Sequence, residues 1–146
     1  MKKLILFSLI SFCIATATAQ VINVPDKAQK QLQEKYVGAT DVKWTNSVVS
    51  YLASFKMNGV PCKAHYDISG NWDYTEWFIH KDAIPEKAKD SFSKSKYRDW
   101  SVKSVASVEY PKDPTPLYRY EAKKGMSKNY VFFDKEGNLI KTNTTL

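Results

Sequence analysis

Two short stretches of the chain carry the apolar spacing of a helix, and each begins at a proline. After Pro25, the side chains of Ala28, Leu32 and Tyr36 recur four residues apart and therefore form one stripe on a helix surface. The same spacing follows Pro85. Proline suits the first position of a helix, because the N–H that it lacks would have no partner there. The pattern predicts two short helices, each with one buried face.

After each predicted helix the apolar period changes to two, which is typical of strands with one buried face. The clearest series contains Val60, Cys62, Ala64, Tyr66 and Ile68. The pattern predicts two groups of four strands. They are expected at residues 42–44, 51–55, 60–68 and 72–78, and again at residues 102–104, 118–122, 127–135 and 139–143.

Two sequence segments occur twice, in the same order. Residues 24–28 (VPDKA) recur at 84–88 (IPEKA), and residues 66–71 (YDISGN) recur at 133–138 (FDKEGN). The first segment opens a helix, and the second is expected to form a hairpin turn in which glycine takes a positive φ. The second copy is longer by about seven residues, which the proline-rich segment 111–116 is expected to supply. Such a repeat indicates two copies of one supersecondary unit.

The predicted fold class is α+β. Each unit, residues 24–79 and residues 84–143, is expected to consist of a helix followed by a roughly four-stranded antiparallel sheet. The helices are expected to pack on one sheet face. The two units meet near residues 80–83 and form a single domain, residues 20–146, of a normal size for one compact core.

The first 19 residues have the organisation of a secretory signal peptide. Lys2 and Lys3 form a basic start, residues 4–14 are apolar, and the small residues 17–19 precede an expected cleavage after Ala19. The apolar run is too short to span a membrane, and no later stretch is long and apolar enough. The sequence therefore predicts a periplasmic or secreted protein without a transmembrane segment.

The mature chain is expected to be moderately basic. Loss of Lys2 and Lys3 lowers the formal net charge from +7 to +5. A lysine-rich surface is the ordinary explanation, and long-range attraction of an acidic partner or a polysaccharide is the alternative. Lysine and arginine nowhere cluster densely enough to indicate nucleic-acid binding.

Catalytic and metal-binding patterns are not found in the sequence. Cys62 and His65 are three residues apart on one predicted strand, so their side chains point to opposite faces, and His80 stands alone. A zinc site needs about three or four converging ligands. There is no Gly-x-Ser-x-Gly motif and no glycine-rich phosphate loop. The sequence therefore predicts a protein that is not an enzyme, without a metal or cofactor, in which Cys62 is a buried core residue.

The sequence resembles a family of exported bacterial proteins, the PepSY-like or beta-lactamase-inhibitor-protein-like domains. The residues that carry this resemblance are Val24 to Pro25, Tyr36, Gly38 to Trp44, Tyr66 to Asp67, Gly70 to Trp72, and Tyr74 to Glu76. The resemblance implies a tandem α/β repeat whose sheet presents a broad surface to a partner, and residence in the envelope or periplasm. In the inhibitor after which the fold is named, that surface binds an enzyme. The second copy departs from the pattern, with Ser104 in place of Trp44 and Leu139 in place of Trp72.

Aromatic residues suggest where a partner would bind. On the strand near residues 127–135, Tyr130 and Phe132 alternate with Val131 and Phe133, so the strand is apolar on both faces. An antiparallel sheet normally keeps one face wet. Either another segment covers this strand, or it belongs to a recognition patch. The candidate partner-binding residues, chosen as types that anchor interfaces, are Trp77, Trp100, Arg119, Tyr130 and Phe132.

Three functions are compatible with these observations. The first is a non-catalytic, exported protein-binding or inhibitory module that acts through its sheet surface on another envelope or extracellular protein. The second is a small-ligand binder of the cell envelope that holds a lipid or glycan in an aromatic-lined cleft between the units. The third is a structural envelope component that self-associates.

Overall fold

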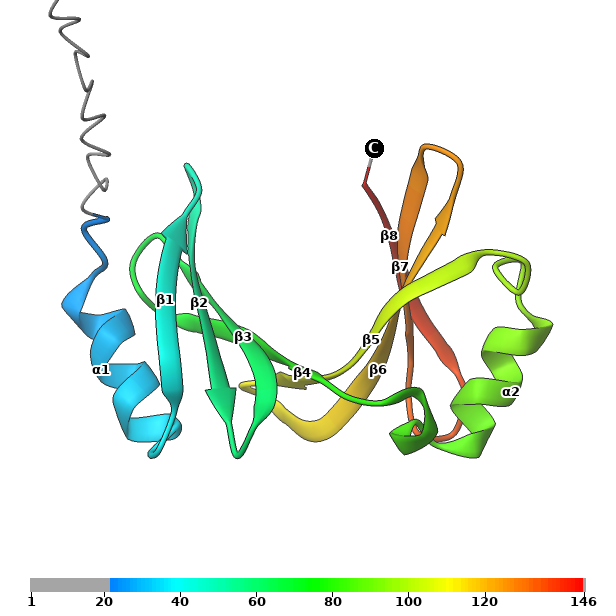
Figure 1. Cartoon of the computed structure of the whole chain (residues 1–146), viewed down its shortest axis with the longest axis horizontal. Coiled ribbons are helices and arrows are strands. Elements are labelled where there is room, and N and C mark those ends of the chain that lie inside the picture. Colours follow the sequence, from blue (N-terminus) through cyan, green and yellow to red (C-terminus); the bar gives the residue numbers. More distant parts are fainter. Residues whose placement is uncertain (1–21, 146) are drawn as a thin grey trace, which may run out of the picture.

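The structure, a computed structural model, describes residues 22–145 and contains two α-helices, one short 3₁₀ helix and eight strands in that part of the chain (Figure 1). The expected signal peptide, residues 1–19, lies outside the described residues. In chain order the elements are α1 (Asp26–Lys35), β1 (Thr40–Asn46), β2 (Ser50–Met57), β3 (Val60–Asp67), β4 (Trp72–Phe78), η1 (Lys81–Ala83), α2 (Glu86–Lys94), β5 (Ser101–Tyr110), β6 (Asp113–Lys124), β7 (Ser127–Phe133) and β8 (Leu139–Thr145).

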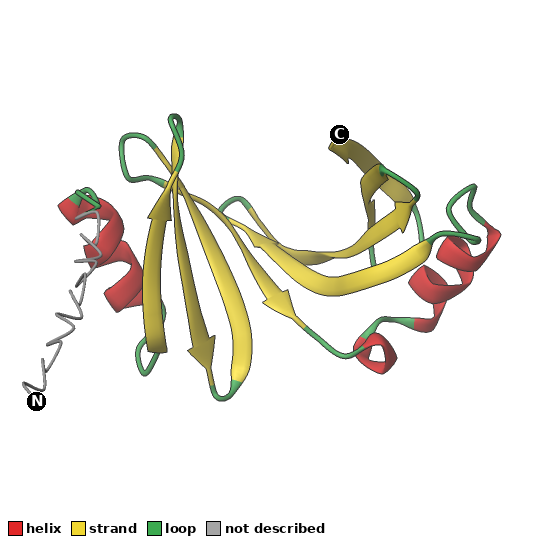
Figure 2. Cartoon of the chain, turned by 45° about the horizontal axis from the view of Figure 1, so that its top comes forward, coloured by secondary structure: helices red, strands yellow, loops and turns green. Residues whose placement is uncertain are grey.

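All eight strands belong to one antiparallel sheet, in which they follow one another in sequence order from β1 to β8. The α+β class with an antiparallel sheet is therefore confirmed. The sequence predicted a roughly four-stranded sheet in each half. In the structure β4 also pairs with β5, Thr75 with Glu109 and Phe78 with Ala106, and this pairing joins the two groups of strands. The sheet bends strongly, so that β1 to β3 stand in one arm and β7 and β8 in the other, with β4 to β6 between them (Figures 1 and 2).

Both helices begin directly after a proline, as predicted, and both have an acidic residue in the first turn and a lysine in the last. These charges suit the helix dipole. Each helix buries a stripe four residues apart: Ala28 and Leu32 in α1, and Ala88 and Phe92 in α2. The helices lie on the outer sides of the two arms (Figure 1).

Two main cores form under the helices, on the same face of the sheet. Thr75 of β4 is hydrogen-bonded to Tyr36 beside α1, and its partner across the ladder is Glu109 of β5. Val105 lies on that same face of β5 and belongs to the core under α2. The first core contains Ala28, Leu32, Ala53, Phe55, Cys62, Ala64 and Tyr66, and the second contains Ala88, Phe92, Val105, Tyr120, Ala122, Val131 and Phe133.

Cys62 lies in the first core, as the alternating pattern predicts. Its side chain is buried, and burial raises the pKa of its thiol to about 11. A thiol with so high a pKa carries little thiolate at neutral pH and is a poor nucleophile. Cys62 is therefore a packing residue in this fold.

The two predicted hairpin turns are present, and each touches a helix. Gly70 and Gly137 have φ values of +79° and +86°, which suit glycine. In each turn the aspartate, Asp67 or Asp134, accepts a hydrogen bond from the backbone N–H four residues later. The glycines approach the helices so closely that a Cβ on Gly137 would lie 2.6 Å from the carbonyl oxygen of Lys87 in α2.

The proline-rich segment lies in a hairpin that is longer than its counterpart. Strands β5 and β6 have 10 and 12 residues, whereas β1 and β2 have 7 and 8. Near the hairpin end, Glu109 accepts a hydrogen bond from Lys35 of α1 at 2.7 Å and lies 3.4 Å from Nε1 of Trp77. The extended hairpin therefore packs against the first half of the molecule.

Candidate protein-binding surface

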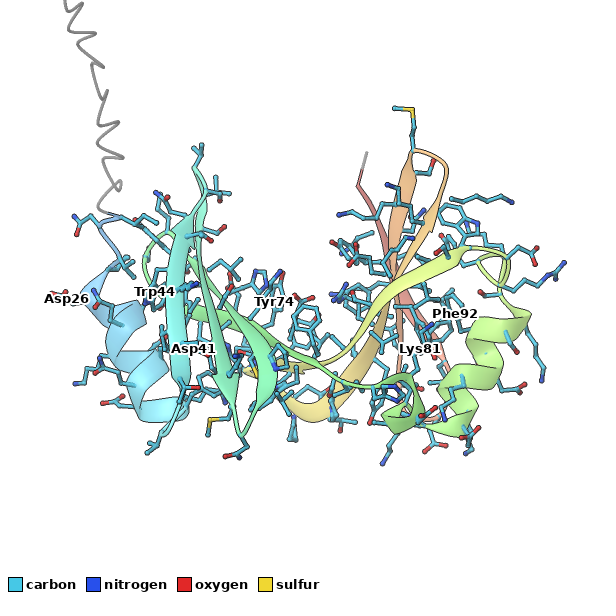
Figure 3. All side chains as sticks on the ribbon, viewed as in Figure 1. Asp26, Asp41, Trp44, Tyr74, Lys81 and Phe92 are labelled. Atoms are coloured by element: carbon cyan, nitrogen blue, oxygen red, sulfur yellow. The ribbon has the colours of Figure 1, made fainter. Side chains whose placement is uncertain are left out.

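The sheet face opposite the helices lines the space between the two arms. No helix of the described chain covers this face, and Figure 3 shows Tyr74 directed into the space. We call it the concave face. Its defining residues come from β3 to β8 and are His65, Tyr74, Glu76, Phe78, Tyr110, Arg119, Tyr130, Phe132 and Lys141.

The floor of the concave face is apolar. Ala106, Val108 and Phe132 form a third buried cluster, and tyrosines pack against it. Phe132 belongs to β7, and on the other face of β7 Val131 and Phe133 are buried in the core under α2. The prediction that this strand is apolar on both faces is confirmed, and its second face is the floor of the concave face.

Arg119 brings a buried positive charge to this floor. Only 3% of the residue is exposed, and its Nε lies 2.7 Å from Oε1 of Glu76. The guanidinium lies 4.7 Å from the ring centre of Tyr130 and 5.7 Å from that of Phe78. Ala106 on β5 pairs with Arg119 of β6 on one side and with Phe78 of β4 on the other. Its side chain is small enough to let the guanidinium reach across β5. The arginine is thus fixed by an ion pair and by two rings.

Glu76 is kept ionised by its neighbours. Burial would raise the pKa of this carboxyl, but the contacts with His65 and Arg119 outweigh burial and hold the pKa below its usual value. Nε2 of His65 lies 3.5 Å from Oε2 of Glu76, and the imidazole stacks on Tyr74 with ring centres 4.1 Å apart. Glu76 is therefore a carboxylate at neutral pH, matched by Arg119.

A second carboxylate, Glu121, completes the polar network. It accepts a hydrogen bond from Ser104 at 2.8 Å and lies 3.8 Å from Nη1 of Arg119. Lys128 is 3.9 Å from its other oxygen. Arg119 therefore holds both carboxylates of the concave face.

Lysines stand over the aromatic rings at the rim of this face. Lys141 donates a hydrogen bond to the Tyr110 hydroxyl at 2.9 Å, and its ammonium lies 4.6 Å from the ring centre of Phe132. Lys63 lies 5.4 Å from the ring centre of Phe78. Cation–π contacts of this kind hold an ammonium group in a defined place.

The middle of the concave face has a hollow of about 270 Å³. Its lining combines aromatic rings with charged groups and includes Asn143 of β8. Pockets for small ligands usually have volumes of about 300 to 1,000 Å³. The hollow therefore suits one side chain of a partner better than a whole lipid or glycan.

One family of proteins matches most of this chain. The model of the family described as "Putative beta-lactamase-inhibitor-like, PepSY-like" matches residues 49–141. The chain belongs to this PepSY-like family. The matched residues include all those that define the concave face. The resemblance seen in the sequence is confirmed.

Solved structures share the PepSY-like fold of this chain. A BLIP-like protein from Bacteroides fragilis superposes with a TM-score of 0.70 at 25% identity, over 86% of this chain and 89% of that protein. A DUF2874 family protein from Bacteroides uniformis gives a TM-score of 0.70 at 25% identity, over 83% and 89%. A Bacteroides eggerthii protein described as "putative periplasmic" gives 0.69 at 22% identity, over 83% and 88%, and so shares the fold. No curated protein sequence matches the chain.

The structure separates the five candidate binding residues of this PepSY-like chain into two groups. Arg119, Tyr130 and Phe132 meet on the concave face. Trp77 and Trp100 lie on the helix side, where Trp77 packs against Tyr36 and Trp100 against Tyr97, with ring centres 5.9 and 5.2 Å apart. Both are half-buried and pack against the cores, Trp77 from β4 and Trp100 from the loop that precedes β5.

Several concave-face residues were not among the binding residues proposed from the sequence. Tyr74, Glu76 and Lys141 lie beside Arg119 and Phe132 only because β4 to β8 share one sheet. A signal for Tyr74 and Glu76 was present, since they alternate with Thr75 and Trp77 and therefore face away from the buried side of β4.

Neither metal-binding clusters nor membrane-spanning helices are found in the described part of the chain. Within residues 22–145, no three side chains of histidine, cysteine, aspartate or glutamate converge as metal ligands would. No helix in this range is long and apolar enough to cross a membrane.

Proposed function

We propose that this PepSY-like chain is a non-catalytic, exported binding module that holds a protein partner on its concave face. The observation that carries the proposal is the gathering of Tyr74, Tyr110, Tyr130 and Phe132 on a sheet face that no helix of the described chain covers. The three tyrosines are half-buried, and tyrosine is enriched at interfaces because it combines an apolar ring with a hydroxyl that can bond to a partner. The binding role is also in keeping with the inhibitor-like family and with the BLIP-like structural neighbour.

The chemistry of the face supports protein binding. Tyrosine and arginine dominate the residues that contribute most to protein interfaces, because they combine apolar area with polar tips. Here the arginine is already fixed by Glu76, so binding costs little side-chain entropy. A partner enzyme whose active-site rim entered the space between the arms would be blocked, and inhibition is therefore the specific activity that we propose.

The two arms also carry apolar side chains at their tips. Val48 and Val49, in the turn between β1 and β2, are 91% and 71% exposed, and Met126, in the turn between β6 and β7, is 96% exposed. Both turns lie at the upper ends of the arms, on the open side of the space between them (Figure 1). They would extend the contact to a partner as wide as the molecule itself.

We propose the same cellular location that the sequence predicts. Cleavage near Ala19 would release residues 20–146 as one domain into the periplasm or medium. The similar protein described as "putative periplasmic" supports this proposal.

We also propose that the two halves are copies of one unit. Each has a helix followed by four strands, and each places a turn glycine against its helix, Gly70 against Ala28 and Gly137 against Lys87. These matching contacts support duplication.

Lipid or glycan binding, the alternative, has less support. The hollow of about 270 Å³ is small for a whole lipid or glycan. A glycan would have to lie across the rim.

Affinity capture from an envelope extract of the source organism tests the proposed function. The immobilised protein is compared with its Tyr130→Ala and Val37→Ala variants, because Val37 is exposed beside α1, away from the concave face. We expect Tyr130→Ala to weaken capture of a specific protein by about 2 kcal/mol, the usual threshold for a dominant interface residue. Val37→Ala should capture it as well as the wild type. Equal capture by all three proteins, or capture of none, would contradict the proposal.

A further inference from the structure

The lysines of the concave face differ in their partners: Lys128 lies 3.9 Å from Glu121, whereas two others have no carboxylate partner among the described residues. Lys63 and Lys141 form no ion pair with any residue in the described part of the chain. Lys63 stands opposite Glu76 in the ladder, yet its ammonium lies over Phe78 instead. Glu76 and Glu121, the carboxylates of this floor, are both held by Arg119. The face therefore carries an excess of positive charge.

Lysines on the helices differ in this respect. Four of them have an acidic neighbour within their own helix or in the adjoining turn. The pairs are Lys30 with Glu34, Lys87 with Glu136, Lys89 with Glu86, and Lys94 with Asp90. These paired helix lysines provide the comparison for Lys63 and Lys141.

The unmatched ammonium groups are also held in position. Lys141 is fixed by the Tyr110 hydroxyl and the Phe132 ring, and Lys63 by the Phe78 ring. Positive charges arranged around an apolar floor fit a binding partner that offers carboxylates next to an apolar or aromatic side chain.

We propose that the concave face receives an acidic, protruding segment of a protein partner, whose carboxylates pair with Lys63 and Lys141. This inference rests on the proposed function and adds the chemistry of the partner. A protruding protein segment can approach the concave face between the two arms, whereas a flat bilayer surface would meet the arm tips first (Figures 1 and 3). The apolar cluster around Phe132 has no counterpart in a purely polar polysaccharide chain.

A titration with poly-L-glutamate tests the charge preference, with NMR shifts of the labelled protein as the readout. At low salt we expect the shift changes to gather on the concave face. The Lys63→Gln/Lys141→Gln protein should bind about tenfold more weakly, the lower end of electrostatic effects on association. The control, Lys30→Gln/Lys94→Gln, removes the same charge from the two helices and should bind like the wild type. Circular dichroism checks that both variants fold.

Equal binding of poly-L-glutamate by the concave-face variant and the wild type would overturn this inference. Tighter binding of heparin than of poly-L-glutamate at this face would also overturn it and would indicate a polysaccharide partner. Tighter binding of phosphatidylglycerol vesicles would likewise overturn it and would indicate a lipid surface. If a protein is captured through Tyr130 and binds the Lys63→Gln/Lys141→Gln variant as tightly as the wild type, the inference that the partner is acidic is wrong. The proposed function would still stand. Failure to capture any protein would count against the proposed function instead.

Discussion

Arg119 places a buried positive charge directly beneath the aromatic rings of the concave face. Removing two charges from water is costly, and the cost is recovered only when the partners and their remaining hydrogen-bonding groups are well matched. Glu76 and Glu121 supply the opposite charges here, and Ser104 Oγ lies 3.5 Å from Nη2 of Arg119. The side chain of Arg119 therefore keeps the floor of the proposed binding surface in one arrangement.

Replacing Arg119 with methionine should destabilise the protein, because Glu76 would remain buried without its partner. We expect a loss of about 3 kcal/mol in the free energy of unfolding, as for other broken buried ion pairs. Chemical denaturation measures this loss. The double variant Arg119→Met/Glu76→Gln, which removes both charges, should recover part of it. A single variant as stable as the wild type would show that the pair does not hold the floor together.

The pH dependence of unfolding gives a second readout of the same pair. The pKa of Glu76 is lowered in the folded protein, so its ionised form contributes stability above the ordinary glutamate pKa. This contribution is lost as the pH falls through the lowered folded-state pKa. The acid side of the stability profile should therefore become flatter in Arg119→Met. An unchanged acid limb would contradict the role given to Arg119.

At the scale of elements, each helix is fixed against the turn that follows the third strand of its half. The contact is closest at Gly137, where a Cβ would lie 2.6 Å from the carbonyl oxygen of Lys87 and from the Ser91 hydroxyl oxygen. The backbone of α2 cannot easily move away from this turn, because Ala88 and Phe92 of the helix are buried in the second core. The glycine thus sets the distance between turn and helix.

Gly137→Ala and Gly59→Ala separate this close approach from backbone strain. Both glycines have positive φ, +86° and +80°, but a Cβ on Gly59 would meet nothing within 4 Å. Gly59→Ala should therefore cost only the strain, roughly 1 kcal/mol. Gly137→Ala should cost about 3 kcal/mol, because the added clash displaces α2. Thermal and chemical unfolding of both variants measure the difference, and equal losses would refute the packing role of Gly137.

Local chemistry made the elements predictable from the sequence. Prolines marked where Asp26 and Glu86 begin the helices, and Asp-x-x-Gly turns marked the hairpins. The two-sided apolar strand β7 was likewise visible in its residues, because alternation assigns each side chain to a face. For Trp77 and Trp100, residue type was used without the face, and both proved to pack on the helix side.

At the scale of the whole molecule, the concave face depends on contacts that no local pattern encodes. Glu76 on β4 meets Arg119 on β6 only because β5 lies between them and offers the small side chain of Ala106. The pairing of β4 with β5 joins the halves, and the long β5–β6 hairpin reinforces the joint through the bond of Lys35 to Glu109. The sequence therefore predicted the two apolar faces of β7, but not which residues of other strands surround it.

Photo-crosslinking in the exporting cell tests most directly whether the concave face is where a protein binds. A p-benzoylphenylalanine is placed at Asn143, which lines the hollow, or at Lys30 on the outer side of α1 as the control. The account predicts a covalent protein adduct from position 143, lost in Tyr130→Ala, and none from position 30. Adducts that form only from position 30, or equally from both positions, would contradict it.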